Sequence, residues 1–171
     1  MENNRIYGDR IYIRPITPED TDLIVEWRNS DIVMDNFIIR EPLSREVHLN
    51  WYNTKILNGQ VSQFIIYIAD GDIPIGSVYM QDIDTLDKSG EFGIFIGDRG
   101  TGRGYGREAM GLMMDYGRDV LGLTTVNLRV LAGNEVARHL YKQYGFREID
   151  QETILIEGKP TCIVHMQYRY E

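Results

Sequence analysis

Cysteine is nearly absent from this chain, since its 171 residues include only Cys162. A single cysteine excludes an internal disulfide and a metal cluster held by several thiolates. Histidine is almost as scarce, and His48, His139 and His165 lie too far apart in the sequence to show metal-ligand spacing. We therefore predict that the protein uses no metal ion.

Positive charge is also in short supply. The chain has 18 Lys and Arg residues against 26 Asp and Glu residues, a formal net charge of −8. This balance argues against nonspecific binding to nucleic acid or to an anionic membrane, and it is compatible with a cationic substrate such as a polyamine. No apolar run approaches the length of a membrane span, and residues 1–5 lack the features of a signal peptide. We expect a cytoplasmic protein.

Apolar residues recur with the periods of strands and helices along the whole chain, which predicts one domain over residues 1–171. Because strands outnumber helices and hairpins mix with helix crossovers, we expect an α/β (α+β) fold with a mixed, mostly antiparallel sheet. Seven strands are predicted at 10–14, 62–69, 73–82, 90–97, 124–131, 146–156 and 161–170. Four helices are predicted at 17–29, 44–58, 105–120 and 134–144.

The segment 97–106 contains five glycines among its ten residues and joins a predicted strand to a predicted helix. Glycine lets the backbone approach an anion closely, and the first N–H groups of a helix point at such an anion. The side chains of Arg99, Arg103 and Arg107 can add contacts to phosphate oxygens. The segment is therefore predicted to bind phosphate. The alternative is a glycine-rich turn at a strand–helix junction that binds no ligand.

Two familiar phosphate loops are excluded, because the Gly-Lys-Ser/Thr of a Walker loop is absent and the G-x-G-x-x-G spacing fails. The segment instead resembles the pyrophosphate loop of GNAT acetyltransferases, written Q/R-x-x-G-x-G/A. Two registers compete: the one from Arg99 to Gly104 has the expected first residue, and the one from Thr101 to Gly106 lacks it. We favour the second, which ends where the helix begins and resembles the RimJ/RimL-like branch.

A second motif supports the resemblance, because Asn134-x-x-Ala137-x-x-Leu140-Tyr141-x-x-x-Gly145-Phe146 looks like the closing signature of the same family. The resemblance covers nearly the whole chain. It implies a GNAT fold with two central strands splayed apart, and transfer of an acetyl group from acetyl-CoA by direct attack of an amine. The residues that it implies for acetyl-CoA binding are Ile94, Phe95, Ile96, Thr101, Gly102, Arg103, Gly104, Tyr105, Gly106, Asn134 and Arg138.

The resemblance also suggests the catalytic groups. The amine must lose a proton, and Glu91, at the start of the strand before the loop, is our first choice of base; Asp82 and Asp84 are alternatives. Tyr141 resembles the tyrosine that protonates the departing thiolate, although it also fits a core position on an amphipathic helix. The backbone N–H of Ile94 is placed to stabilise the thioester oxygen. A non-catalytic acyl-CoA-binding module would not need Glu91 and Tyr141.

The acceptor is suggested by the N-terminal third of the chain. The runs Glu26-Trp27-Arg28-Asn29-Ser30-Asp31 and Ser44-x-x-x-His48-x-x-Trp51-Tyr52 look like a branch that acetylates nucleotide-linked amino sugars, as in pseudaminic-acid biosynthesis. There Arg28 would bind the diphosphate and His48 the sugar or a phosphate; as alternatives, Arg28 pairs with Asp31 and His48 is a surface residue.

Other acceptors stay open. Arg129 stands where the sugar-nucleotide enzymes carry an acid, which weakens the resemblance. A ribosomal-protein N-terminal amine and a polyamine such as spermidine are the other acceptors that we consider. The sequence does not specify the oligomeric state, although Tyr168 and Tyr170 near the C-terminus permit a homodimer.

Overall fold

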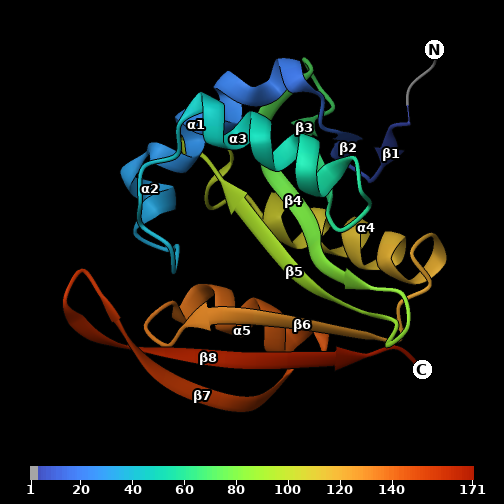
Figure 1. Cartoon of the computed structure of the whole chain (residues 1–171). Helices are drawn as coiled ribbons and strands as arrows, with labels where there is room; N and C mark the ends of the chain where they lie inside the picture. Colours follow the sequence, from blue (N-terminus) through green and yellow to red (C-terminus); the bar gives the residue numbers. More distant parts are fainter. Residues whose placement is uncertain (1–3) are drawn as a thin grey trace.

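The chain folds around a single mixed sheet of eight strands in a computed structural model that describes residues 4–171 (Figure 1). The strand order is β1-β2-β3-β4-β5-β6-β8-β7, and every described neighbouring pair is antiparallel except β5 and β6. The strands are β1 (Ile6–Tyr7), β2 (Ile11–Pro15), β3 (Ser62–Ile68), β4 (Ile73–Asp84), β5 (Ser89–Ile96), β6 (Thr125–Leu131), β7 (Arg147–Ile156) and β8 (Lys159–Arg169).

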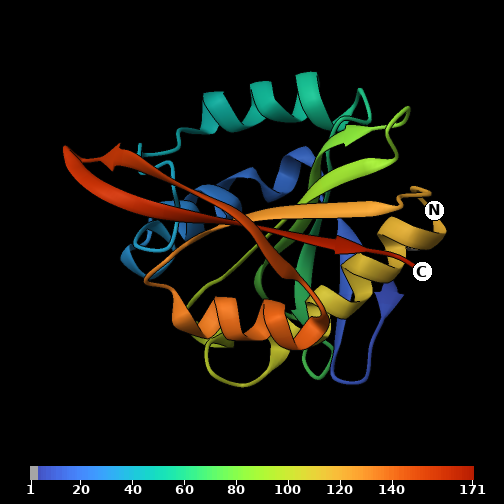
Figure 2. The same ribbon diagram turned by 90° about the horizontal axis from the view of Figure 1, so that it is seen from below.

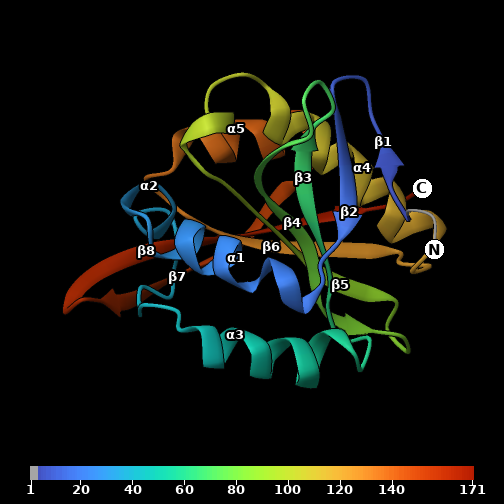
Figure 3. The ribbon, with the colours of Figure 1, turned by 90° about the horizontal axis from the view of Figure 1, so that it is seen from above.

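Helices cover both faces of this sheet, as the view from above shows (Figure 3). On one face lie α1 (Thr21–Asn29), α2 (Asp31–Met34) and α3 (Arg45–Trp51), which continues as a π-helical segment at Tyr52–Ile56. On the other face lie α4 (Tyr105–Asp119) and α5 (Glu135–Tyr144). Short 3₁₀ turns at Pro18–Asp20 and Asp98–Gly100 precede α1 and α4.

Alternation along the strands sorts the apolar side chains into two cores. In β3, Phe64 and Ile66 join the core under α4, which includes Met110 and Met113, whereas Ile65 joins the core under α1. Adjacent side chains of a strand point to opposite faces, so this pattern follows from the pleat. Each fully buried aliphatic side chain contributes about 1.5–3 kcal/mol to folding, so these side chains stabilise the centre of the sheet.

The predicted fold class is confirmed, and three details of it are corrected. The sheet has eight strands rather than about seven, because the two-residue strand β1 is too short to show a period. Residues 4–171 form five α-helices where about four were expected, since α2 is a single turn inside the segment that has no clear periodicity. The helix expected from Thr17 starts as a 3₁₀ turn, in which Asp20 accepts the backbone N–H of Thr17.

The C-terminal strands β7 and β8 form a long hairpin that extends past the rest of the sheet (Figure 2). Strand β7 lies at the edge and pairs only with β8. The outer side chains Ile149 and Leu155 are 56% and 72% exposed, so this edge carries apolar surface. No helix within residues 4–171 is long and apolar enough to span a membrane.

Candidate active site

The site lies where the sheet opens between β5 and β6. The two strands pair only over Ser89–Glu91 and Thr125–Asn127 and then diverge (Figure 1). Beyond Glu91, β5 stays paired with β4 and β6 stays paired with β8, so the facing edges of both strands lack a strand partner. A cavity of about 520 Å³ occupies this fork and is lined by side chains from both halves of the sheet. The predicted splay of the two central strands is therefore present.

The pleat of β5 divides the cavity into two sides. Phe92, Ile94 and Ile96 pack with the core under α4 and α5, while Phe95 packs with the core under α1. Gly93 shares the face of Phe95, and the ring of Tyr79 from β4 lies directly over it: a β-carbon at Gly93 would come within 2.2 Å of that ring. The fork therefore connects a side lined by α1 and α3 with a side lined by α5.

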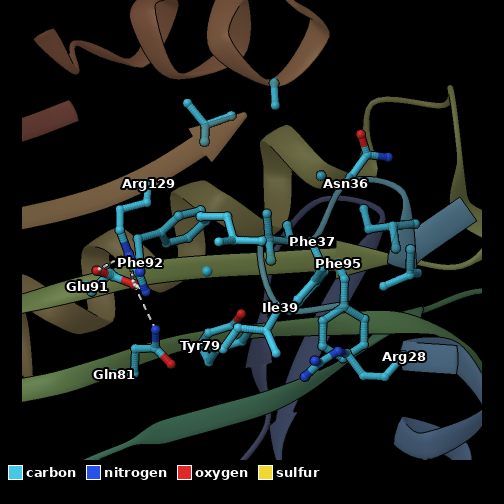
Figure 4. Close-up of a pocket in the computed structure, with 18 of the residues that line it drawn as sticks. Arg28, Asn36, Phe37, Ile39, Tyr79, Gln81, Glu91, Phe92, Phe95 and Arg129 are labelled. Atoms are coloured by element: carbon cyan, nitrogen blue, oxygen red, sulfur yellow. Dashed lines mark hydrogen bonds and ion pairs between the residues drawn. The ribbon is translucent and has the colours of Figure 1, made fainter. Parts of the chain in front are cut away.

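Glu91 lies at the apex of the fork, in the last residue pair that joins β5 to β6. Its carboxylate accepts hydrogen bonds from the Arg129 guanidinium at 2.9–3.3 Å and from Gln81 Nε2 at 2.8 Å (Figure 4). Within residues 4–171, Glu91 is the only acidic residue that lines the cavity. Of the two alternative bases, Asp82 is exposed, and Asp84 accepts the N–H groups of Leu86 and Asp87 in a turn.

Tyr141 lines the same cavity from α5, on the opposite side of the sheet. Its ring packs edge-on against Phe92 and tilts against Phe146, each at 6.1 Å between centroids, and the residue is only 8% exposed. Burial and the neighbouring Tyr79 raise the pKa of Tyr141, so its hydroxyl stays protonated at neutral pH. No hydrogen bond occupies that hydroxyl within the described residues, which leaves its proton available to a bound molecule.

The glycine-rich segment turns from β5 into α4 with two residues in the left-handed region. Gly102 and Gly104 have φ of +75° and +79°, which a residue with a β-carbon adopts only at a cost. Gly104 is the N-cap of α4 and has no side chain to satisfy the first helical N–H groups. Gly106 lies in the first turn of α4, where a β-carbon would approach Ile96 to 3.2 Å. The free N–H groups of this helix start suit an anion.

Asn134 and Arg138 both make contacts within the protein. The Asn134 side chain caps α5 by accepting the N–H of Ala137 at 3.2 Å, and the residue also lines the cavity. Arg138 donates to the carbonyl of Ala132 at 2.8 Å, in the turn after β6, and to Glu148 of β7 at 2.6 Å, so both donors hold neighbouring elements in place. Arg138 faces a second, shallower hollow beside α5.

Arg28 extends from the end of α1 into the cavity (Figure 4). Its guanidinium lies 4.0 Å from the centroid of the Phe37 ring, and its Nε is buried without a hydrogen-bond partner within residues 4–171. Burial lowers the pKa of Arg28, and no carboxylate lies beside it, so the suggested pairing with Asp31 is absent in the described structure. Within the described part of the chain the positive charge of Arg28 is uncompensated, because the only acidic residue of the cavity, Glu91, is already paired with Arg129.

His48 is buried at 3% exposure on α3 and lines the cavity, so it is not a surface residue. Its Nδ1 lies 3.1 Å from the Thr21 hydroxyl, which itself donates to the carbonyl of Pro18 at 2.7 Å. Because that hydroxyl proton is already used, we assign the imidazole proton to Nδ1. Burial and the nearby Arg28 charge lower the pKa of His48, so the ring is neutral and its Nε2 is an acceptor with no partner in the described part of the chain.

Sequence reasoning missed part of this constellation. Tyr79 and Gln81 line the cavity from β4, and Phe37 lines it from the segment after α2. The alternation of β4 could have placed Tyr79 and Gln81 on one face, but only the β4–β5 register puts Gln81 opposite Glu91. No group of three or more potential metal ligands comes together within residues 4–171.

Comparisons with known proteins agree with this geometry. A family model described as an acetyltransferase (GNAT) domain matches residues 10–147. The spermidine N(1)-acetyltransferase of Escherichia coli K12 is 31% identical over 136 residues, which cover 80% of this chain and 72% of that protein.

Solved structures extend the similarity to nearly the whole fold. The crystal structure of spermidine N-acetyltransferase from Vibrio cholerae in complex with CoA and spermine superposes with a TM-score of 0.87 at 25% identity, covering 95% of this chain and 96% of that one. A dodecameric structure of the Vibrio enzyme gives a TM-score of 0.81 at 26% identity, covering 95% of each chain. The splayed strands, the glycine-rich helix start and these matches together show that the chain belongs to the GNAT acetyltransferases and is an acyltransferase.

Proposed function

We propose that the chain transfers an acetyl group from acetyl-CoA to a primary amine by direct attack across the fork between β5 and β6. The observation that carries this proposal is the fork itself, which joins a side lined by Tyr141 to a side lined by Glu91. The unpaired edge of β5 at Ile94, Phe95 and Ile96 would hold the pantetheine arm. The N–H groups from Thr101 to Gly106 would hold the pyrophosphate, as the RimJ/RimL-like register predicts.

In this mechanism three protein groups, the N–H of Ile94, Glu91 and Tyr141, each stabilise a developing charge or transfer a proton. The amine nitrogen forms a bond to the thioester carbon while the N–H of Ile94 stabilises the developing oxyanion, and the C–S bond then breaks. Glu91 receives the amine proton, through a water molecule if needed. Three of the four contacts from Arg129 and Gln81 fall on Oε1 and only one on Oε2, so Oε2 keeps a lone pair for that proton. Tyr141 gives its proton to the departing sulfur.

For the acceptor, we propose a polyamine such as spermidine first. The support is the similarity to spermidine acetyltransferases over most of the chain. Two features of the chain agree with it. The net charge is −8, and the Nε2 of His48, which has no partner within residues 4–171, can accept a hydrogen bond from an ammonium or amine N–H.

A second candidate, an amino sugar linked to a nucleotide, is favoured by one specific observation. Arg28 brings an uncompensated positive charge into the cavity, which would repel a polyamine and attract a diphosphate. Two unit charges 4 Å apart interact by about 4 kcal/mol at an effective dielectric constant of 20, so this charge is large enough to choose between acceptors.

The discriminating experiment measures free-thiol release from acetyl-CoA with spermidine, a UDP-linked amino sugar or an N-terminal peptide as acceptor. If the acceptor is a polyamine, spermidine is turned over, and Arg28→Met leaves that rate unchanged or raises it. The substitution removes the charge that lies over the Phe37 ring and keeps an unbranched apolar chain at this position. If only the UDP-linked sugar reacts and Arg28→Met abolishes that reaction, the polyamine proposal is wrong. Arg45→Met, on the exposed surface of α3, is the matched control.

We further propose that the chain forms a homo-oligomer through the edge strand β7. An exposed strand edge with apolar side chains is a template for pairing with another chain, and Ile149 and Leu155 provide that surface. The dodecameric Vibrio relative supports self-association in this family. Light scattering after size-exclusion chromatography tests it: the double variant Ile149→Lys, Leu155→Lys should be monomeric, whereas an unchanged mass would exclude this edge.

A further inference from the structure

A half-buried carboxylate outside the catalytic cavity links the glycine-rich loop to the start of the sheet. Glu108, in the first turn of α4, accepts the backbone N–H groups of Arg10 and Ile11 through Oε1 at 2.7 and 3.2 Å. Its Oε2 accepts Nε of Arg10 at 3.0 Å. The close fit also involves Gly8, because a β-carbon there would come within 2.7 Å of Oε1.

These contacts hold the charge on Glu108. Burial by itself would raise the pKa of Glu108, but the backbone N–H groups of Arg10 and Ile11 and the Arg10 guanidinium outweigh it, so the pKa lies below its ordinary value. The Glu108 side chain is 16% exposed, whereas that of Arg10 is 52% exposed. Glu108 therefore orients Arg10 from a sheltered position.

Arg10 transmits this orientation to the loop. Its Nη1 donates to the backbone carbonyl of Arg103 at 2.9 Å, and its guanidinium lies 4.8 Å from the centroid of the Tyr105 ring. The Arg103–Gly104 peptide is trans, so its N–H points away from its carbonyl. Pulling the Arg103 carbonyl toward Arg10 therefore turns the Gly104 N–H to the other side of the loop.

This peptide needs such an external restraint. It is flanked by Gly102 and Gly104, both in left-handed conformations, and glycine has the largest conformational freedom to lose. The backbone N–H groups from Thr101 to Gly104 donate to no backbone carbonyl within residues 4–171. Without a restraint this peptide would adopt several orientations, and only some of them would bind phosphate. The apparent affinity for phosphate would fall in proportion to the fraction of loops in a binding orientation.

We propose that Glu108 and Arg10 are positioning residues, which hold the Arg103–Gly104 peptide with its N–H directed at the pyrophosphate of acyl-CoA. The proposal rests on the proposed use of this loop for acetyl-CoA. Neither residue touches the reacting atoms, so their effect should appear in cofactor affinity and leave the chemical step unchanged.

The test compares two donors, acetyl-CoA and S-acetylpantetheine, which carries the same thioester without the pyrophosphate. We expect Arg10→Ala to raise KM for acetyl-CoA and Kd for CoA by about 10-fold to 100-fold, the range for losing one hydrogen bond of a charged group. The kcat at saturating acetyl-CoA and the kcat/KM for S-acetylpantetheine should stay within twofold. Equal losses with both donors would indicate a general structural role and overturn the proposal.

The variant Glu108→Gln tests whether Arg10 positions the loop peptide or contacts the phosphate directly. This variant keeps the positive charge of Arg10 and releases its guanidinium from the carboxylate. We expect weaker CoA binding; unchanged or tighter binding would mean that Arg10 contacts the phosphate itself, and the proposal would be wrong. Arg5→Ala removes a positive charge from the same hairpin, where Arg5 pairs with Asp72 at 3.7 Å, and should leave CoA binding unchanged. Wild-type protein that binds no CoA would refute the proposed function itself, which is a different result.

Discussion

Removing the hydroxyl of Tyr141 gives the sharpest test of the catalytic assignment. In Tyr141→Phe the ring contacts with Phe92 and Phe146 stay in place, and no protein hydrogen bond is lost within the described structure. We therefore expect the free energy of unfolding to change by less than about 1 kcal/mol. Loss of a general acid typically lowers the rate by about 10²-fold to 10⁴-fold, which corresponds to about 2.7–5.4 kcal/mol in activation free energy.

The assay must report the chemical step, because product release limits many enzymes. Single-turnover acetylation with enzyme in excess over acetyl-CoA measures that step directly, and titration calorimetry should show CoA affinity within twofold of the wild type. Tyr144→Phe is a matched control, since Tyr144 lies one turn later on α5 and also packs on Phe146 but does not line the cavity. A single-turnover rate for Tyr141→Phe within twofold of wild type would refute the role of Tyr141 as acid.

Three further predictions follow from the same geometry. Gly104→Val should abolish CoA binding in calorimetry. The control Gly59→Val imposes a similar left-handed strain of about 1–2 kcal/mol at φ +73°, in open space, and should still bind CoA. CoA binding by both variants would exclude the loop as the CoA site. Glu91→Gln should lower kcat by about 10²-fold to 10⁴-fold, while Asp84→Asn leaves it unchanged; wild-type kcat in Glu91→Gln would remove Glu91 as the base. Burial raises the pKa of Tyr79 from 10.0 to about 12, so between these pH values the folded state retains a proton that the unfolded state loses. The free energy of unfolding should therefore fall by up to about 2.7 kcal/mol as pH rises from 10 to 12. Urea unfolding at pH 9 and 11 should show this slope reduced in Tyr79→Phe, and an equal slope in both proteins would contradict it.

The local sequence was sufficient for most of the secondary structure and for the glycine-rich turn between β5 and α4. Hydrophobic alternation located seven of the eight strands, and the caps Ser44 and Asn134 marked the starts of two helices, because these signals depend on neighbours within a few residues. The glycine-rich loop was recognisable for the same reason. A left-handed backbone at Gly102 and Gly104 needs glycine whatever the rest of the chain does.

The short elements were not predictable in this way. Strand β1 has two residues and α2 has four, so neither offers a full period of its pattern. Such elements form because their neighbours hold them: β1 pairs with β2, and α2 buries Val33 in the core under α1.

The sequence by itself determined that the chain forms a mixed sheet with a glycine-rich turn into a helix, because strand periods, caps and glycine conformations are local properties. Only the tertiary structure decided which charges meet in the cavity. Arg129 lies 38 residues from Glu91 along the chain and neutralises it. Among residues 4–171, Arg28 has no counter-ion and His48 has no partner for Nε2. Those pairings depend on the register between β4 and β5 and on where β5 and β6 diverge, and long-range packing sets both.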